Sequence, residues 1–138
     1  MKQNIYINVG PYVYPMRFSL GASKAIAEKF GSLKEMWEAM KDGASEGGTE
    51  AIIWILETLI RQGCAYKKLF EPNIPYPEGA RYNETGYILP TEEEMLVGVD
   101  MNGDVVEKIM EVISGHSKAE TKIKEKGQDD KIKKTETM

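Results

Sequence analysis

The sequence predicts a mainly α-helical domain with a small N-terminal β-hairpin, an α+β fold, followed by a disordered charged tail. Near the N-terminus, apolar and polar residues alternate with the period of a β-strand. Farther along the chain, apolar residues recur three and four positions apart, as on one face of a helix. After Ser114 the charges are dense and apolar residues are few. We therefore expect one compact domain over residues 1–114 and a disordered tail over 115–138.

The hairpin is expected before the first helix. Apolar residues alternate with polar ones over residues 5–9, and Gly10-Pro11 turns the chain into a second strand. Pro15 has no N–H for a strand ladder, so this strand should be an edge strand or be interrupted before Met16. Because two strands alone are only marginally stable in water, the hairpin must pack against helices or against another subunit.

Two short helices should follow the hairpin. Ser19 is a suitable N-cap for the first, which is expected over residues 20–30. Ser32 and Glu35 have the spacing of a capping box, in which each side chain bonds a free backbone N–H of the other residue. This pair predicts the start of the second helix.

The third helix should be the central one. After a glycine-rich loop at 42–48, Thr49 is expected to cap it. Its residues 52–60 are apolar around most of the helix circumference, which indicates burial on more than one side. Gly63 is expected to weaken the helix beyond that point.

A long ordered loop is expected at 67–90, because four prolines and two glycines between residues 71 and 90 leave no room for a regular element. Aromatic side chains on loops are enriched where proteins contact proteins, so they are candidate partner-binding residues. The alternative is that these rings seal the loop onto the core. The candidates here are Tyr66, Phe70, Tyr76, Tyr82 and Tyr87.

Two more helices complete the predicted domain. Thr91 and Glu94 have the spacing of a second capping box, which should begin a short helix. Asn102-Gly103 should end it, and Asp104 should cap the last helix.

Large side chains on apolar helix faces give a second set of candidate partner-binding residues. Methionine is flexible, so a methionine-rich groove can adapt to varied apolar partners. Ordinary core packing is the alternative use of these side chains. The set comprises Met36, Trp37, Met40 and Trp54.

Composition limits the classes of partner. A net charge of −4 argues against nucleic acid, whose binders usually carry a basic patch. No apolar run approaches the ~20 residues that cross a bilayer, so a membrane partner is not expected. The N-terminus lacks the apolar stretch of a signal peptide, and Cys64 is the single cysteine, so we expect an intracellular protein without disulfides.

No complete catalytic or metal-binding set is found in the sequence. Residues 100–104 alternate oxygen-bearing side chains as a calcium loop does, but the sixth position, which requires glycine, is Val105. His116 has no second histidine, and Cys64 is expected to be a small packed apolar residue. The acidic run at 92–94 fits a helix N-terminus. We therefore expect no enzyme activity, no metal and no cofactor.

Several segments resemble tail assembly chaperones of long-tailed bacteriophages and prophages. The resemblance covers about residues 12–114. Its most specific part is the Glu-Lys-Phe-Gly-Ser-Leu junction at 28–33, between two short helices and before a long apolar helix. The proline-rich insertion at 71–90 and the break at 102–103 depart from the family pattern. The segments that carry the resemblance are 16–22, 26–33, 51–59 and 91–96.

The resemblance implies a non-enzymatic chaperone that binds the tape measure protein and keeps it soluble during tail assembly. Such a protein acts in the cytoplasm of the bacterial host and is not in the mature virion. In this family a frameshift often yields a longer form that recruits the tail tube protein. The hairpin edge and the apolar circumference of residues 52–60 also lead us to expect a homo-oligomer.

The alternative function is a small adaptor or regulatory protein, which a mobile element could encode, that binds its partner by strand addition at the hairpin edge. An enzyme ranks third.

Overall fold

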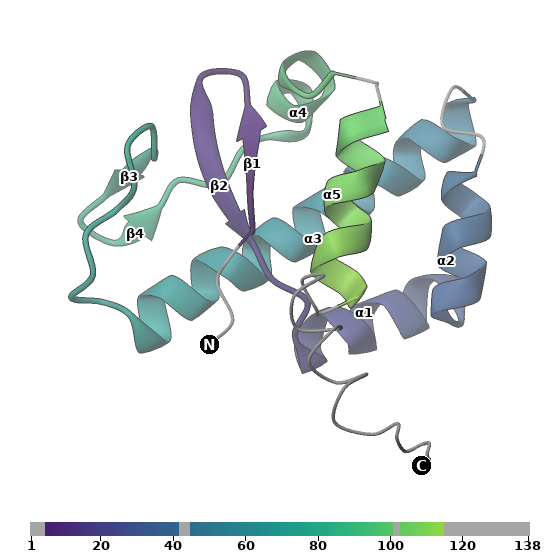
Figure 1. Ribbon diagram of the computed structural model, residues 1–138, viewed down its shortest axis with the longest axis horizontal. Coiled ribbons are helices and arrows are strands. Elements are labelled where there is room, and N and C mark those ends of the chain that lie inside the picture. The colour runs from purple at the N-terminus through teal and green to yellow at the C-terminus, as the bar shows by residue number, and fades with distance from the viewer. Residues whose placement is uncertain (1–4, 42–44, 101–102, 115–138) are drawn as a thin grey trace, which may run out of the picture.

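The computed structural model describes residues 5–41, 45–100 and 103–114. These residues form five helices and two small antiparallel sheets of two strands each (Figure 1). The predicted fold class, mainly helical with an N-terminal hairpin, is confirmed. The predicted tail and His116 lie outside the described residues.

The elements follow the chain in a simple order. The bounds are β1 Ile5–Val9, β2 Tyr12–Met16, α1 Leu20–Phe30, α2 Leu33–Met40, α3 Glu46–Phe70, β3 Tyr82–Asn83, β4 Gly86–Tyr87, α4 Glu92–Gly98 and α5 Gly103–Ser114.

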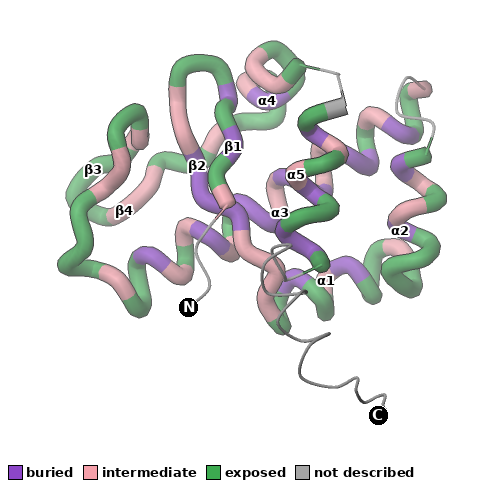
Figure 2. The backbone as a smooth tube through the Cα atoms, in the orientation of Figure 1, coloured by how far each residue is buried: buried purple, intermediate pink, exposed green. Residues whose placement is uncertain are grey.

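Helix α3 is the centre of the fold, and β2, α1, α2, α4, α5 and β4 all pack against it (Figure 1). Its buried residues come mainly from the apolar stretch 51–60, as the sequence predicts. They join one core with buried side chains of the hairpin, α1, α2, α4 and α5. Figure 2 shows how burial concentrates where these elements meet, while the outer turns of the helices are exposed.

The predicted caps of α1, α2 and α4 are confirmed, and the predicted cap of α3 is wrong. Ser19 and Ser32 accept backbone hydrogen bonds at the starts of α1 and α2, and Thr91 begins α4 with both bonds of a capping box. Helix α3, however, begins four residues before the expected position. Ser45 caps it by accepting a bond of 3.0 Å from the N–H of Gly48, so Thr49 lies inside the helix.

Pro15 does not interrupt its strand, which continues through Met16. A two-residue turn makes Val9 and Tyr12 a hydrogen-bonded pair, and such pairs alternate with non-bonded ones along the ladder. Pro15 pairs with Tyr6 at a non-bonded position, where an N–H would point away from β1. The β1–β2 ladder therefore loses no hydrogen bond at Pro15.

The loop after α3 and the start of α5 also differ from the prediction. Tyr82 to Tyr87 form a tiny hairpin, β3–β4, stabilised at its turn by the Asn83 side chain, which accepts a bond of 2.8 Å from the N–H of Thr85. Helix α5 begins at Gly103, so Asp104 lies in its first turn and is not the N-cap. The break was expected at Asn102-Gly103; Asn102 lies outside the described residues, and Gly103 is the first residue of α5.

The 25-residue α3 is the longest helix. Within the described ranges, no helix combines the length and the apolar character needed to cross a membrane.

Candidate functional site

The structure places the four helix-face candidates in or against the core. Met36 and Met40 are buried, so neither can contact a partner of the folded domain, and core packing is their use. Trp37 and Trp54 are partly buried against the same core. The Trp54 ring meets Phe30 edge-on, with 5.5 Å between centroids. The helical period places a side chain on an apolar face, but it cannot tell whether another element covers that face.

Three loop tyrosines form a cluster that joins the loop to α3 and to the hairpin. The rings of Tyr76 and Tyr82 stack at 3.8 Å, and Tyr87 meets Tyr76 edge-on at 5.0 Å. The Tyr14 ring of β2 lies 6.0 Å from Tyr87. Beneath them, the buried Lys67 ammonium lies 4.4 Å from the Tyr76 ring centre. These contacts fit the alternative reading, in which the rings seal the loop.

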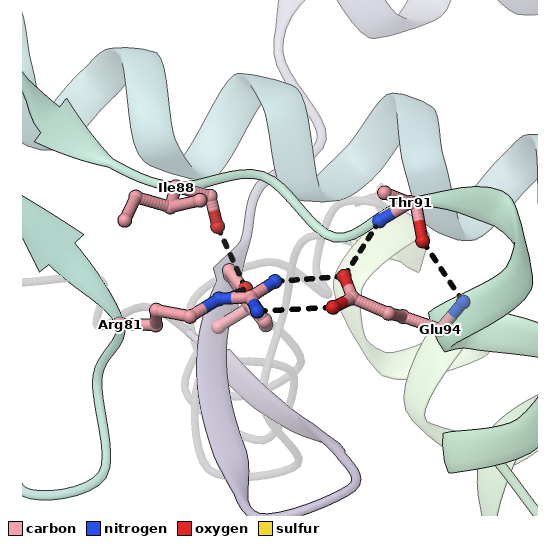
Figure 3. Close-up of polar contacts among 5 residues, drawn as sticks. Arg81, Ile88, Thr91 and Glu94 are labelled. Carbon is pink, nitrogen blue, oxygen red and sulfur yellow. Dashed lines mark hydrogen bonds and ion pairs between the residues drawn. The ribbon is translucent and has the colours of Figure 1, made fainter.

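A polar network fixes the loop at its other end (Figure 3). The guanidinium of Arg81 donates two bonds, of 3.0 and 2.8 Å, to the carboxylate of Glu94 in α4. It also donates to the Tyr14 hydroxyl at 3.1 Å, and that hydroxyl donates to the carbonyl of Ile88 at 2.7 Å. Because Glu94 also closes the Thr91 capping box, its carboxylate ties Arg81 of the loop to the start of α4, and the Tyr14 hydroxyl ties the loop to β2.

The network changes the acidity of its members. The Arg81 guanidinium, helped by the backbone N–H of Thr91, lowers the pKa of Glu94 to about 2. The same ion pair raises the pKa of Arg81. Burial raises the pKa of Tyr14, although the nearby Arg81 opposes this. At neutral pH the pair is therefore ionised and the tyrosine is neutral.

Apolar side chains are exposed where α3 extends beyond the hairpin. Leu69 and Phe70, in the last turn, are 68% and 69% exposed, and Ile74 in the following turn is 51% exposed. We call these three residues the α3-end patch. Tyr66 lies one turn earlier and is half-buried, with the Arg17 guanidinium carbon 3.5 Å from its ring centre. Of the predicted loop aromatics, Phe70 is the most exposed.

Sequence reasoning did not identify Leu69 and Ile74. Phe70 follows the buried positions 63 and 67 of α3 at helical spacing, so it continues the core face of the helix. It is exposed because the helix extends past the elements that would cover it. The exposure of Phe70 depends on how far α3 extends past the elements packed against it. That distance is set by the tertiary structure and cannot be predicted from the local sequence.

A second apolar feature is a groove of about 350 Å³ between the hairpin turn and α4, which we call the hairpin–α4 groove. The two walls approach closely, because the N–H of Gly10 donates to the carbonyl of Gly98 at 3.0 Å. A Cβ at Gly98 would lie 2.6 Å from that nitrogen, so only glycine fits there. The lining residues are Val9, Gly10, Pro11, Tyr12, Arg81, Glu93, Glu94, Val97 and Gly98.

The described residues offer little reactive chemistry. Burial raises the pKa of the Cys64 thiol to about 12, so this thiol is neutral at physiological pH and is a poor nucleophile. In the described ranges, no three histidine, cysteine or acidic side chains come close enough to hold a metal ion. The segment that resembles a calcium loop is only partly described, because Met101 and Asn102 are not.

Comparisons with family models, curated proteins and solved structures gave no match for this chain. The resemblance to tail assembly chaperones therefore stays a prediction from the sequence.

Proposed function

We propose that this chain is a non-enzymatic tail assembly chaperone that binds the tape measure protein and keeps it soluble during tail assembly. The observation that carries the proposal is the α3-end patch. Large apolar side chains that stay exposed together mark sites of protein interaction more often than chance. The resemblance of residues 12–114 to the family supplies the identity of the partner.

The patch gives this function a physical basis. Tape measure proteins are long and helical, with apolar stripes that would otherwise aggregate. A helix of this kind can lay its stripe against Leu69, Phe70 and Ile74, as amphipathic helices do in apolar grooves. The contact between Lys67 and Tyr76 joins the last turn of α3 to the tyrosine cluster, and such a restraint lowers the entropy lost on binding.

The proposal includes the setting in which the protein acts. It works as a homo-oligomer in the cytoplasm of the bacterial host and is not in the mature virion. A longer frameshifted form would contact the tail tube protein.

The test is co-expression with the tape measure protein encoded nearby, followed by measurement of the soluble tape measure fraction. Phe70→Asp and Ile74→Asp should each reduce that fraction at least about fivefold, because each places a charge in the patch. Leu20→Asp is the matched control, since Leu20 is 91% exposed on α1 and is not one of the three patch residues. The proposal is wrong if wild-type protein leaves the tape measure protein insoluble.

The alternative function, an adaptor that adds a strand to the hairpin, also has an observation in its favour. The outer edge of β2 is partly occupied, because the N–H groups of Val13 and Arg17 donate to Gly79 and Leu59. In the described chain, β1 pairs only with β2, so its outer edge at Tyr6 and Asn8 has no strand beside it.

The two functions respond differently to one variant. Asn8 lies at a non-bonded position opposite Val13, so its N–H points away from β2. Asn8→Pro removes that donor and should abolish strand addition while leaving the hairpin ladder intact. Loss of partner binding in Asn8→Pro, with normal binding in Phe70→Asp, would favour the adaptor.

A further inference from the structure

The hairpin–α4 groove is a second exposed apolar surface, separate from the α3-end patch. Val97 lines it and is 80% exposed, and its neighbour Leu96 is 52% exposed. In Figure 1, α4 lies beside the turn of the β1–β2 hairpin, whereas the C-terminal end of α3 lies on the side of β3 and β4. Opposite Val97, the groove has the apolar surfaces of Val9, Pro11 and Tyr12.

The charged side chains in the lining of the groove are Arg81, Glu93 and Glu94. Because Arg81 is held by Glu94 in a bidentate pair, it adds little positive charge to the groove. Glu93 is left as a second carboxylate in the lining.

We propose that the hairpin–α4 groove binds a protein segment in which a large apolar side chain is flanked by lysine or arginine. The apolar side chain lies between Tyr12 and Val97, and the cation faces Glu93. The volume, about 350 Å³, is at the lower end of the range of ligand pockets, so it accommodates part of a segment and not a whole helix.

The apolar side chain and the flanking cation of the bound segment contribute differently to binding. Burial of the apolar side chain supplies most of the affinity, because an exposed ion pair is worth at most ~1 kcal/mol. The Glu93 carboxylate supplies selectivity, since it attracts a basic segment and repels an acidic one. This inference does not depend on the tape measure protein being the partner.

Synthetic amphipathic helical peptides test the proposal. The first has leucine at positions i, i+3, i+4 and i+7 with lysine on both sides, and the second has glutamate in place of every lysine. Fluorescence anisotropy of labelled peptide gives the Kd with the full chain. Wild-type protein should bind the lysine peptide at least about tenfold more tightly than the glutamate peptide.

Two variants test whether the lysine peptide binds in the groove. Val97→Asp should weaken the lysine peptide at least about tenfold, because it puts a charge on the apolar wall. Glu93→Lys should weaken that peptide about three- to tenfold and improve binding of the glutamate peptide, a reversal that mere damage to the fold cannot produce. Met110→Asp is the control, because Met110 is half-exposed on α5 and does not line the groove.

Three results would overturn the proposal. The first is equal binding of the two peptides by wild-type protein. The second is unchanged binding in both groove variants, with circular dichroism showing that they are folded. The third is sedimentation in which wild-type protein is a dimer and Val97→Asp a monomer, because a second copy of the chain would then occupy the groove.

Discussion

The β1–β2 hairpin is held on two sides by different kinds of contact. On one side, β2 meets α3 through backbone atoms, with Gly63 against the carbonyl of Pro15 and the N–H of Arg17 donating to Leu59. On the other side, the segment 71–98 is attached through the side chains of Tyr14, Arg81 and Glu94, and through the bond from the N–H of Val13 to Gly79. The close contact with α3 is between backbone atoms, whereas the second attachment includes the Arg81–Glu94 ion pair.

The first attachment belongs to the core, whereas the second positions α4 and therefore the hairpin–α4 groove. The backbone contact with α3 contains no ionisable group, whereas the other attachment requires an ionised carboxylate at Glu94. Each attachment has its own reporter amide, one in β2 and one directly after it. Exchange of the Arg17 amide follows the attachment to α3, and exchange of the Val13 amide follows the attachment of the loop.

The largest effect is expected from Gly63→Ala. A Cβ at this position would lie 2.6 Å from the carbonyl carbon of Pro15 and closer still to its oxygen, so the strand and the helix must separate. Overpacking of this kind exceeds the gain in helix propensity, and we expect a loss of roughly 2–3 kcal/mol in the free energy of unfolding. Urea unfolding measures it, and exchange of the Arg17 amide should become faster.

Gly47→Ala is the matched control in the same helix. Nothing lies within 4 Å of a Cβ there, so alanine should leave stability unchanged or raise it by up to about 1 kcal/mol. A Gly63→Ala protein as stable as Gly47→Ala would show that the backbone contact does not stabilise the fold.

The sequence predicts local features of this fold well and distant contacts poorly. The caps at Ser19, Ser32 and Thr91 depend on residues three positions away, so they can be recognised in the chain. Gly63 was expected only to weaken its helix, because its contact with Pro15 spans nearly fifty positions. The hydrogen bond between Tyr14 and Arg81 spans 67 positions, and no local sequence pattern predicts it.

Some of the predicted partner-binding residues are buried and others are exposed, and this difference also depends on distant contacts. Met36 and Phe70 both lie on apolar helix faces, yet the first is fully buried and the second is 69% exposed. The period of the pattern is the same in both cases. What differs is whether another element covers the face, and that is decided by how the helices and the hairpin assemble.

A smaller, pH-dependent effect is expected from Glu94→Gln. The pKa of Glu94 is about 2 in the folded chain, below its usual 4.5, so its stabilising effect is complete above pH 4.5 and is lost as the pH falls towards 2. The variant should therefore be less stable than wild type at pH 7, and the difference should vanish near pH 2. Thermal unfolding across this range measures it.

Glu84→Gln controls for the loss of a carboxylate, because Glu84 is exposed at the turn between β3 and β4. In Glu94→Gln the amides of Val13 and Ile88 should exchange faster, while that of Arg17 keeps its wild-type rate. Equal acceleration of all three amides would mean that the two attachments are not independent.

The smallest effect is expected from Tyr82→Ala, which removes one ring of the tyrosine cluster. The Tyr82 ring is half-exposed and stacks on Tyr76 at 3.8 Å, so its loss should cost about 0.5–1.5 kcal/mol. Tyr82→Phe keeps the stacked ring and should cost less. Because the cluster belongs to the loop side, exchange should accelerate at Ile88 and not at Arg17. If exchange of the Arg17 amide accelerates more than exchange of the Ile88 amide, the cluster stabilises the attachment of the hairpin to α3 and not that of the loop.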